Sequence, residues 1–168
     1  MKARCCCAAT LVLLCLPLHA CRQEHHDARL LTLSVRDLTG APARLPGAAA
    51  PVTVINLWAT WCVPCKAEIK NLIALHDAFT ARGGRVIGIA LDSIQPEHLA
   101  PAVAALGIPY PVYAGNADEI LRATGVSAIP ATVFINRSGM IVKRLVGYHA
   151  AEELRKAFEE VLAADNNG

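Results

Sequence analysis

The most informative stretch of this 168-residue chain is residues 52–68, VTVINLWATWCVPCKAE. Its first seven residues are nearly all apolar or β-branched, which predicts a strand that is buried on both faces. Apolar-face residues then recur at helical spacing, at Ile69, Leu72, Ile73, His76 and Phe79. The pair Gly83-Gly84 ends this pattern, so we expect a buried strand that leads into one long helix, with Cys62 and Cys65 at the junction.

Cys62 and Cys65 form a Cys-x-x-Cys pair at the expected start of that helix. Free backbone N–H groups and the helix dipole stabilise a thiolate there, and can lower a cysteine pKa from ~8.5 to between ~3.5 and ~7.5. Cys62 is then placed to attack a disulfide, and Cys65, one turn further on, to resolve the product. Two other interpretations are a structural disulfide and half of a zinc site. Closing so short a loop adds little stability, and no second cysteine pair or His-x-His cluster completes a zinc site, so redox chemistry is favoured.

The remaining pattern predicts an α/β domain. Alternation at Leu31, Leu33 and Val35 indicates a strand that enters a hairpin turn at 37–40, and the Ala-, Pro- and Gly-rich residues 41–51 indicate a loop. Further strands are expected at 85–91, 131–136 and 140–148, a turn or short strand at 109–113, and helices at 96–106, 118–124 and 152–162. His149 is expected to begin the last helix. The order predicts a right-handed βαβ unit in a central sheet covered by helices.

Composition excludes several classes of protein. Hydrophobic residues make up 54% of the chain and charged residues 18%, which rules out intrinsic disorder. Without Lys2 and Arg4, fourteen basic residues stand against fourteen acidic ones, so charge gives no reason to expect a nucleic-acid partner. Five of the seven cysteines lie in the first 21 residues, so the chain is not a disulfide-scaffold protein.

The N-terminal residues 1–21 are typical of an export signal. Lys2 and Arg4 precede an apolar run at 8–18, which is too short to span a bilayer comfortably. The sequence Leu18-His19-Ala20-Cys21 resembles a bacterial lipobox, which predicts a lipoprotein anchored through Cys21. An uncleaved anchor and ordinary cleavage are the alternatives, and all three place the domain outside the cytoplasm. We therefore divide the chain into an export signal (1–21), a tether (22–30), a domain (31–164) and a tail (165–168).

Two blocks carry a resemblance to a known family. Residues 56–68, NLWATWCVPCKAE, resemble the active-site block of the TlpA/ResA-like thioredoxins, and residues 125–135, GVSAIPATVFI, resemble the segment that holds their cis-proline. The similarity runs from about residue 31 to residue 162. The resemblance implies a thioredoxin fold, that is, a central mixed sheet flanked by helices, here with an N-terminal hairpin extension and a helical insert.

The resemblance also implies roles for individual residues. It makes Cys62 the nucleophile, Cys65 the resolving thiol, and Pro130 a cis-proline that leaves the Ile129 backbone free to pair with a substrate chain. Trp61 is expected to form substrate surface. Glu68 matches an acidic residue of the ResA-like group that would accept the Cys65 proton, the alternative being a solvated carboxylate in the first turn of the helix.

One position departs from ordinary thioredoxins, which place an acid six residues before the first cysteine. Here that residue is Asn56, which we expect to be a hydrogen-bonded structural amide.

The family's activity implies a thiol-disulfide oxidoreductase on the periplasmic side of the membrane. It would reduce disulfide-containing proteins, as in cytochrome c maturation or copper-site assembly, and be recharged by a membrane electron donor of the CcdA/DsbD type. No metal is expected, and no cofactor besides the Cys62–Cys65 disulfide. One rival is a thiol peroxidase, which lacks a resolving cysteine three residues on. The other is a copper chaperone, which usually spaces its cysteines more widely and lacks a cis-proline such as Pro130.

Overall fold

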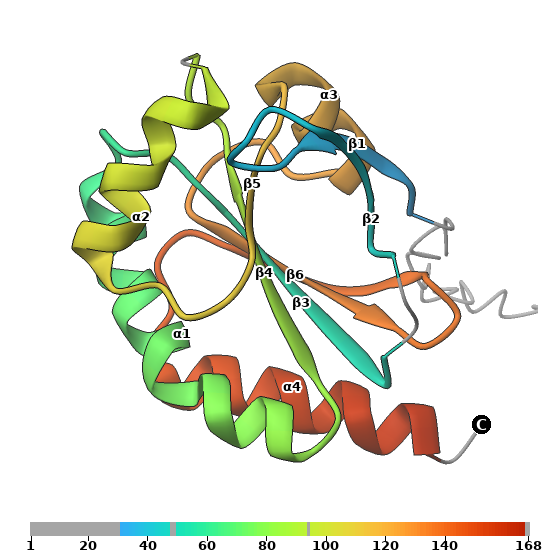
Figure 1. The fold of residues 1–168 in the computed structure, drawn as a ribbon. Helices are drawn as coiled ribbons and strands as arrows, with labels where there is room; N and C mark the ends of the chain where they lie inside the picture. The colour runs from blue at the N-terminus through green and yellow to red at the C-terminus, as the bar shows by residue number, and fades with distance from the viewer. Residues whose placement is uncertain (1–30, 48–49, 94, 167–168) are drawn as a thin grey trace, which may run out of the picture.

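The computed structural model describes residues 31–47, 50–93 and 95–166, which build one seven-stranded sheet and its covering helices (Figure 1). The strands are β1 (Leu33–Arg36), β2 (Pro42–Leu45), β3 (Val52–Trp58), β4 (Arg85–Ala90), β5 (Val112–Ala114), β6 (Ala131–Asn136) and β7 (Ile141–Val146). The helices are α1 (Val63–Ala81), a 3-10 turn η1 (Pro96–Leu99), α2 (Ala100–Leu106), α3 (Ala117–Thr124) and α4 (Ala151–Asn166). The expected α/β architecture, with its hairpin extension and helical insert, is confirmed.

The strand β3 lies inside the sheet, as its apolar sequence predicts. The strand order is β2-β1-β5-β4-β3-β6-β7, so β3 pairs in parallel with β4 and antiparallel with β6. Every residue of β3 is buried. Because β3 is followed directly by α1, the sheet fixes where that helix begins.

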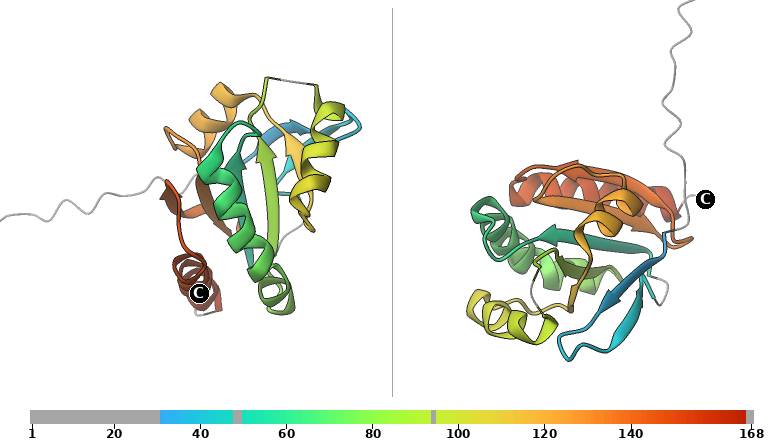
Figure 2. Two further views of the ribbon diagram at one scale, coloured as in Figure 1. Left: turned by 90° about the vertical axis from the view of Figure 1, so that its left-hand side faces the viewer. Right: turned by 90° about the horizontal axis from the view of Figure 1, so that it is seen from above.

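Alternate residues of β3 enter two different cores. Val52 and Val54 pack with Leu72 of α1 and Phe158 of α4, and these two helices run side by side in Figure 1. Ile55 and Leu57 face the opposite side of the sheet, in a cluster with residues of α3 and of the β1–β2 hairpin. Figure 2 gives two further views of this arrangement. The side chain of Asn56 shares the α1 side of β3 with Val54, because side chains alternate along a strand.

The loop predicted at 41–51 is wrong in part, because β2 occupies Pro42–Leu45 and pairs with β1. Proline and alanine are poor strand formers, which is why the composition indicated a loop. Pro42 is tolerated because it is the first residue of a strand at the sheet edge, where a missing N–H breaks no ladder. Within the described residues two peptide bonds are cis, Leu45-Pro46 and Ile129-Pro130, and only the second was expected.

The chain ends of the domain differ slightly from expectation. The helix α4 begins at Ala151 rather than at His149, and it continues to Asn166, two residues into the predicted tail. The predicted export signal, Cys21 and the tether lie outside the described residues. Within the described ranges, no helix combines the length and the apolar character that crossing a membrane requires.

Candidate active site

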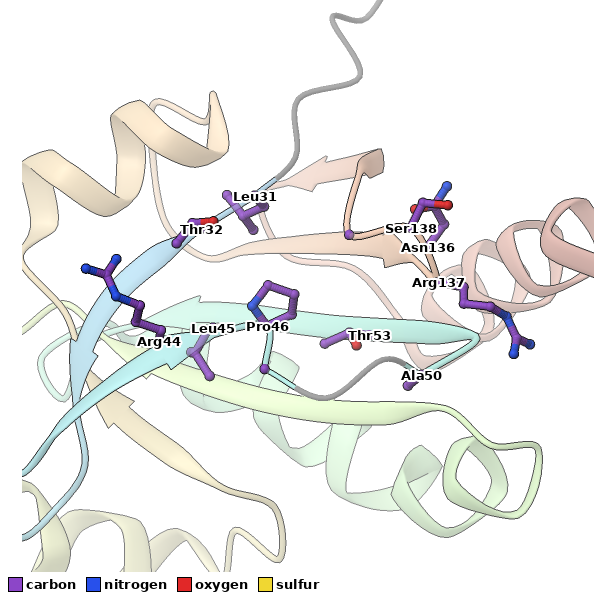
Figure 3. A pocket seen from close by; sticks show the side chains of 12 residues that line it. Leu31, Thr32, Arg44, Leu45, Pro46, Ala50, Thr53, Asn136, Arg137 and Ser138 are labelled. Carbon is purple, nitrogen blue, oxygen red and sulfur yellow. The ribbon is translucent and has the colours of Figure 1, made fainter.

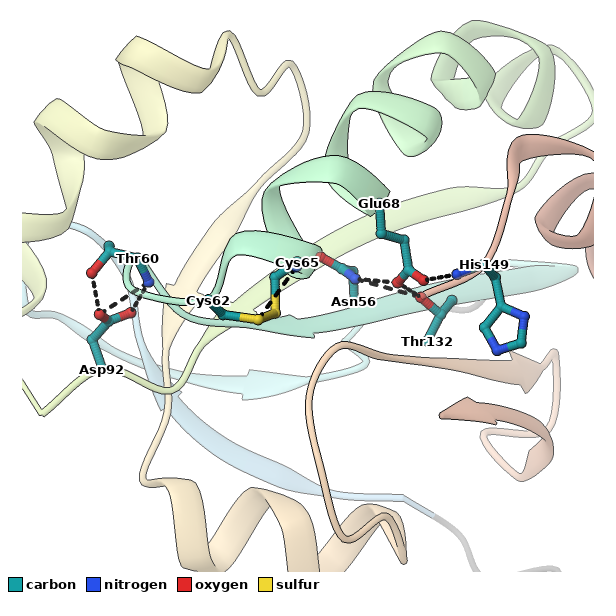
Figure 4. The surroundings of a disulfide bond; sticks show 8 residues. All are labelled: Asn56, Thr60, Cys62, Cys65, Glu68, Asp92, Thr132 and His149. Atoms are coloured by element: carbon teal, nitrogen blue, oxygen red, sulfur yellow. Dashed lines mark hydrogen bonds between the residues drawn. A yellow bond between two sulfur atoms is a disulfide. The ribbon is translucent and has the colours of Figure 1, made fainter. Parts of the chain in front are cut away.

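Cys62 and Cys65 are joined by a disulfide at the start of α1 (Figure 4). Cys62 is the N-cap residue, and its sulfur accepts a hydrogen bond from the backbone N–H of Cys65 at 3.3 Å. Pro64 occupies the first turn, where no N–H is needed. The N–H that contacts the Cys62 sulfur would stabilise a thiolate there once the bond is reduced.

The two sulfur-bearing residues differ in access to solvent. Cys62 is 5% exposed and Cys65 is fully buried, so an incoming disulfide reaches Cys62 first. Two large apolar side chains beside Cys62 point to solvent, Trp61 at 69% exposure and Val63 at 75%. Their place beside the dithiol agrees with the expectation that Trp61 forms substrate surface.

The predicted cis-proline segment lies against this pair. The Ile129-Pro130 peptide bond is cis, and Ile129 packs against the buried cluster that contains both cysteines. Pro130 is buried, and its carbonyl accepts a hydrogen bond from Gly147 N at 2.8 Å. The structure therefore places Ile129 beside the dithiol, while the contacts of Trp61, Ile129 and Pro130 with a substrate stay predictions.

Glu68 is fully buried on α1, so the alternative of a solvated first-turn carboxylate is wrong. Its Oε1 accepts hydrogen bonds from Asn56 Nδ2 at 3.0 Å and from Thr132 Oγ1 at 2.8 Å. Its Oε2 accepts one from the backbone N–H of His149 at 2.9 Å. Burial raises the pKa of Glu68, and these hydrogen bonds oppose the rise without cancelling it. A carboxyl group poised in this way can take up a proton and release it again.

The expectation that Asn56 is a hydrogen-bonded amide is confirmed. Its Nδ2 donates to Glu68 and, at 3.4 Å, to Thr132 Oγ1. Its Oδ1 is buried and accepts no hydrogen bond from any residue in the described part of the chain. The partners Thr132 and His149 were missed from the sequence, although a threonine inside the apolar strand β6 is a signal that could have pointed to the first of them.

A second missed group holds the other side of the active-site loop. Asp92 follows β4, and its carboxylate accepts hydrogen bonds from the N–H of Thr60 at 3.0 and 3.1 Å and from the Thr60 hydroxyl. Figure 4 shows this pair on one side of the disulfide and the Glu68 cluster on the other. Thr60 stands two residues before Cys62, so Asp92 fixes the backbone that delivers the nucleophile.

A histidine on a helix could be a metal ligand, but His76 of α1 is not part of a metal-binding cluster in the described residues. The described ranges contain no cluster of three or more histidine, cysteine or acidic side chains suited to a metal ion. The His76 ring lies 5.8 Å from that of Tyr110, whose pKa is raised by burial and by the negative charge of Glu68. Tyr110 is therefore a neutral neighbour of the Glu68 cluster.

A pocket of about 330 Å³ lies elsewhere in the fold, between the β1–β2 hairpin and the β6–β7 turn (Figure 3). Arg44 and Arg137 are among its lining residues. Neither cysteine lines it, so it is separate from the dithiol site.

Comparisons with known proteins agree with this geometry. The model of the AhpC/TSA family matches residues 26–144. The thiol-disulfide oxidoreductase ResA of Geobacillus thermodenitrificans is 25% identical over 126 residues, covering 74% of this chain and 71% of that protein. The sporulation thiol-disulfide oxidoreductase A of Bacillus subtilis is 26% identical over 110 residues, covering 64% and 67%. A crystal structure of a thioredoxin-family thiol:disulfide interchange protein from Chlorobium tepidum superposes with a TM-score of 0.66 at 26% identity, over 81% of this chain and 99% of that one.

Proposed function

Because the chain belongs to the AhpC/TSA family and is a ResA-like thiol-disulfide oxidoreductase of thioredoxin fold, we propose that it reduces disulfides in client proteins outside the cytoplasm. The observation that carries this proposal is the Cys62–Cys65 disulfide at the start of α1. The more exposed cysteine is the N-cap residue, and the fully buried one lies one turn behind it.

The reaction follows from this arrangement of the two sulfurs. In the reduced protein the Cys62 thiolate attacks one sulfur of a client disulfide, which forms a mixed disulfide and releases the other client sulfur as a thiolate. Cys65 then loses its proton and attacks the Cys62 sulfur, which frees the second client thiolate. Two electrons pass to the client, and the Cys62–Cys65 disulfide seen in the structure is the oxidised product.

Glu68 supports the second step as the acceptor of the Cys65 proton. It lies three residues after Cys65, on the same face of α1, and both residues are fully buried. Neither side chain is exposed to solvent, so a nearby carboxylate is better placed than bulk water to take up the proton. The raised pKa of Glu68 brings its affinity for a proton closer to that of a thiolate.

The same proposal covers where the domain is anchored and how its disulfide is reduced again. A lipidated Cys21 would hold the domain at the membrane, and a membrane electron donor of the CcdA/DsbD type would reduce the disulfide again. Clients in cytochrome c maturation or copper-site assembly suit an enzyme so placed. Mass spectrometry of the mature chain should find a lipidated Cys21 at its N-terminus, and retention of Met1 would contradict the anchor.

A redox titration tests the direction of transfer. We expect a potential nearer the ~−270 mV of thioredoxin than the ~−120 mV of the oxidant DsbA, a gap of ~7 kcal/mol for two electrons. Cys65→Ser should trap clients as mixed disulfides on Cys62, whereas the matched variant Cys62→Ser should trap none. A potential close to that of DsbA, or trapping that depends on Cys65, would refute the proposal.

The family match supports a second candidate, a thiol peroxidase. Peroxide consumption by the reduced protein measures it directly. Turnover of peroxide faster than that of a protein disulfide would favour the peroxidase over the reductase.

A further inference from the structure

A second pocket, of about 210 Å³, lies between α2 and the first turn of α1, close to the dithiol. We call it the α1–α2 pocket, and it is lined by Trp58, Thr60, Lys66, Ala102, Ala105 and Leu106. Figure 4 shows Thr60 on the side of the disulfide away from Glu68. Because Thr60 stands two residues before Cys62, their Cα atoms lie within about 7 Å of each other. A polypeptide whose disulfide meets Cys62 can therefore reach this pocket.

Two lining residues of the α1–α2 pocket belong to the core around the cysteines. Trp58 is fully buried in the cluster that contains Cys62 and Cys65. Leu106 of α2 packs against the same cluster. The place of the pocket relative to the dithiol is therefore fixed by packing between a strand and a helix.

Two alanines of α2 keep the pocket open. Ala102 and Ala105 are three residues apart, so they lie on the same face of the helix. Both line the pocket, and an alanine side chain ends at its Cβ. No residue of α2 is buried, so this helix covers the core only in part. A larger side chain at either position would occupy the space that the alanines leave.

The lining indicates what kind of group fits the pocket. It is apolar apart from Thr60, whose hydroxyl is bound to Asp92, and Lys66. Lys66 forms no ion pair with any residue of the described ranges, and none of the lining residues is acidic. Sites for small molecules and cofactors usually measure ~300–1,000 Å³, which is larger than this pocket. One aliphatic side chain, with a carboxylate beside it for Lys66, suits the lining better than a cofactor does.

We propose, on the basis of the function proposed above, that the α1–α2 pocket is a client subsite. It takes one aliphatic side chain from the segment that flanks the client's cysteine, and Lys66 favours an acidic residue next to that side chain. Filling an apolar pocket with a matching group is worth roughly 10-fold or more in kcat/KM. An exposed ion pair adds up to about 5-fold. The subsite therefore selects clients by shape first and by charge second.

Peptides with a single cysteine, activated as a disulfide with thionitrobenzoate, test this selection. The reduced Cys62 thiolate attacks the peptide sulfur, the peptide becomes disulfide-linked to Cys62, and thionitrobenzoate leaves as a coloured thiolate. The peptides carry leucine or glycine at each of the two positions on either side of their cysteine. We expect one leucine peptide to react roughly 10-fold faster than its glycine counterpart.

Two variants fill the pocket, and a third is their control. Ala105→Leu and Ala102→Leu should each bring the ratio of the leucine rate to the glycine rate close to one. Ala104→Leu should keep the wild-type ratio, because Ala104 is exposed on the same helix and does not line the pocket. Equal rates for all wild-type pairs of peptides would overturn the subsite. So would a ratio that survives both filling variants, or one that Ala104→Leu abolishes as well.

Reversal of charge tests Lys66 separately, with aspartate or lysine beside the preferred leucine. The wild type should favour the aspartate peptide by up to about 5-fold, Lys66→Glu should favour the lysine peptide, and salt should weaken both preferences. Lys70→Glu should keep the wild-type preference, because Lys70 is exposed on α1 and does not line the pocket. Each result is a ratio within one variant, so a general effect on the Cys62 thiolate cancels. An unchanged ratio in Lys66→Glu would overturn the role of Lys66.

This assay follows only the first attack by Cys62 and needs no client protein. Selectivity among the peptides in a protein that reduces no protein disulfide would refute the proposed function and leave the subsite intact. Reduction of client proteins without selectivity among the peptides would do the opposite. Dimerisation of the wild type that Ala105→Leu abolishes, measured by size-exclusion chromatography, would place a second copy in the pocket and overturn the proposal.

Discussion

Replacing Asp92 by alanine should loosen the segment that carries Cys62. The Asp92 carboxylate accepts the Thr60 N–H with both oxygens and the Thr60 hydroxyl with one of them. Both residues are only partly buried, so water can replace some of what is lost. The substitution nevertheless removes a charged hydrogen-bond acceptor, and the alanine side chain offers none in its place.

The magnitude follows from the number of bonds. A hydrogen bond to a charged group contributes ~1.5–3 kcal/mol when it is buried, and partial exposure lowers each of the two bonds here to about 1 kcal/mol. The Thr60 N–H lies within hydrogen-bond distance of both Asp92 oxygens, and we count this as one hydrogen bond. We therefore expect Asp92→Ala to cost about 2 kcal/mol and Thr60→Val, which removes only the hydroxyl bond, about 1 kcal/mol. The double variant should cost about as much as Asp92→Ala alone, which gives a coupling of about 1 kcal/mol.

Urea unfolding of the oxidised protein measures these values. With a slope of roughly 2 kcal/mol per molar, a loss of about 2 kcal/mol lowers the midpoint by about 1 M. Thr80→Val is the matched control, since the Thr80 hydroxyl donates to His76 O within its own helix and does not contact Asp92. Its effect should add to that of Asp92→Ala. Full additivity of Thr60→Val with Asp92→Ala would refute the reasoning.

Other substitutions test separate parts of the argument. In Gly84→Ala the new Cβ would lie 2.4 Å from Phe158 and 2.9 Å from the carbonyl oxygen of Phe79, so we expect a loss of at least ~1–3 kcal/mol in urea unfolding, and an unchanged midpoint would argue against the clash. Burial raises the pKa of Glu68 above its ordinary 4.5, so the stability that this group contributes is complete below pH 4.5 and is lost as the pH rises through the folded-state pKa. Glu68→Gln should therefore be more stable relative to the wild type at pH 8 than at pH 4.5, and a difference that is constant with pH would contradict a raised pKa. Stopped-flow kinetics of the same variant should show resolution of a mixed disulfide slowed about 10²-fold near neutral pH, and an unchanged pH profile would remove Glu68 from the mechanism. In the reduced protein, iodoacetamide should modify Cys62 before Cys65, because Cys65 is fully buried; mass spectrometry of the peptides would expose the reverse order.

The elements that the sequence predicted well are those with an unbroken pattern. The apolar run of β3 and the helical spacing after it place the strand, the helix and the cysteines between them correctly. The edge strand β2 was missed because its residues have low strand propensity, and pairing with β1 overrides that preference. Local patterns could not show that Pro42 would begin a strand at the sheet edge, where its missing N–H is tolerated.

The residues of the candidate site also fall into two groups, those that the sequence indicated and those that only the fold revealed. The local sequence pattern indicated Cys62 and Cys65, and the resemblance of the same short segment to the TlpA/ResA-like family indicated Glu68. The groups that hold this segment come from far along the chain, 32 residues away for Asp92 to Thr60, 64 for Thr132 to Glu68 and 81 for His149 to Glu68. Only the folded sheet brings such residues together. Polar residues within or just after apolar strands, such as Thr132 and Asp92, are the signal that was available.

The amide of Asn56 has a consequence for how charge is accommodated in the interior. An amide carries donors on one side and an acceptor on the other, and here the donor lies 3.0 Å from Glu68 while the acceptor Oδ1 is unpaired within the described chain. Half a turn about the last side-chain bond would exchange the two. The same residue can then donate to a carboxylate or accept from a carboxylic acid, with no change in the strands around it. An aspartate at this position would offer acceptors alone and would repel the ionised form, so asparagine lets one rigid cavity host both protonation states of its acid.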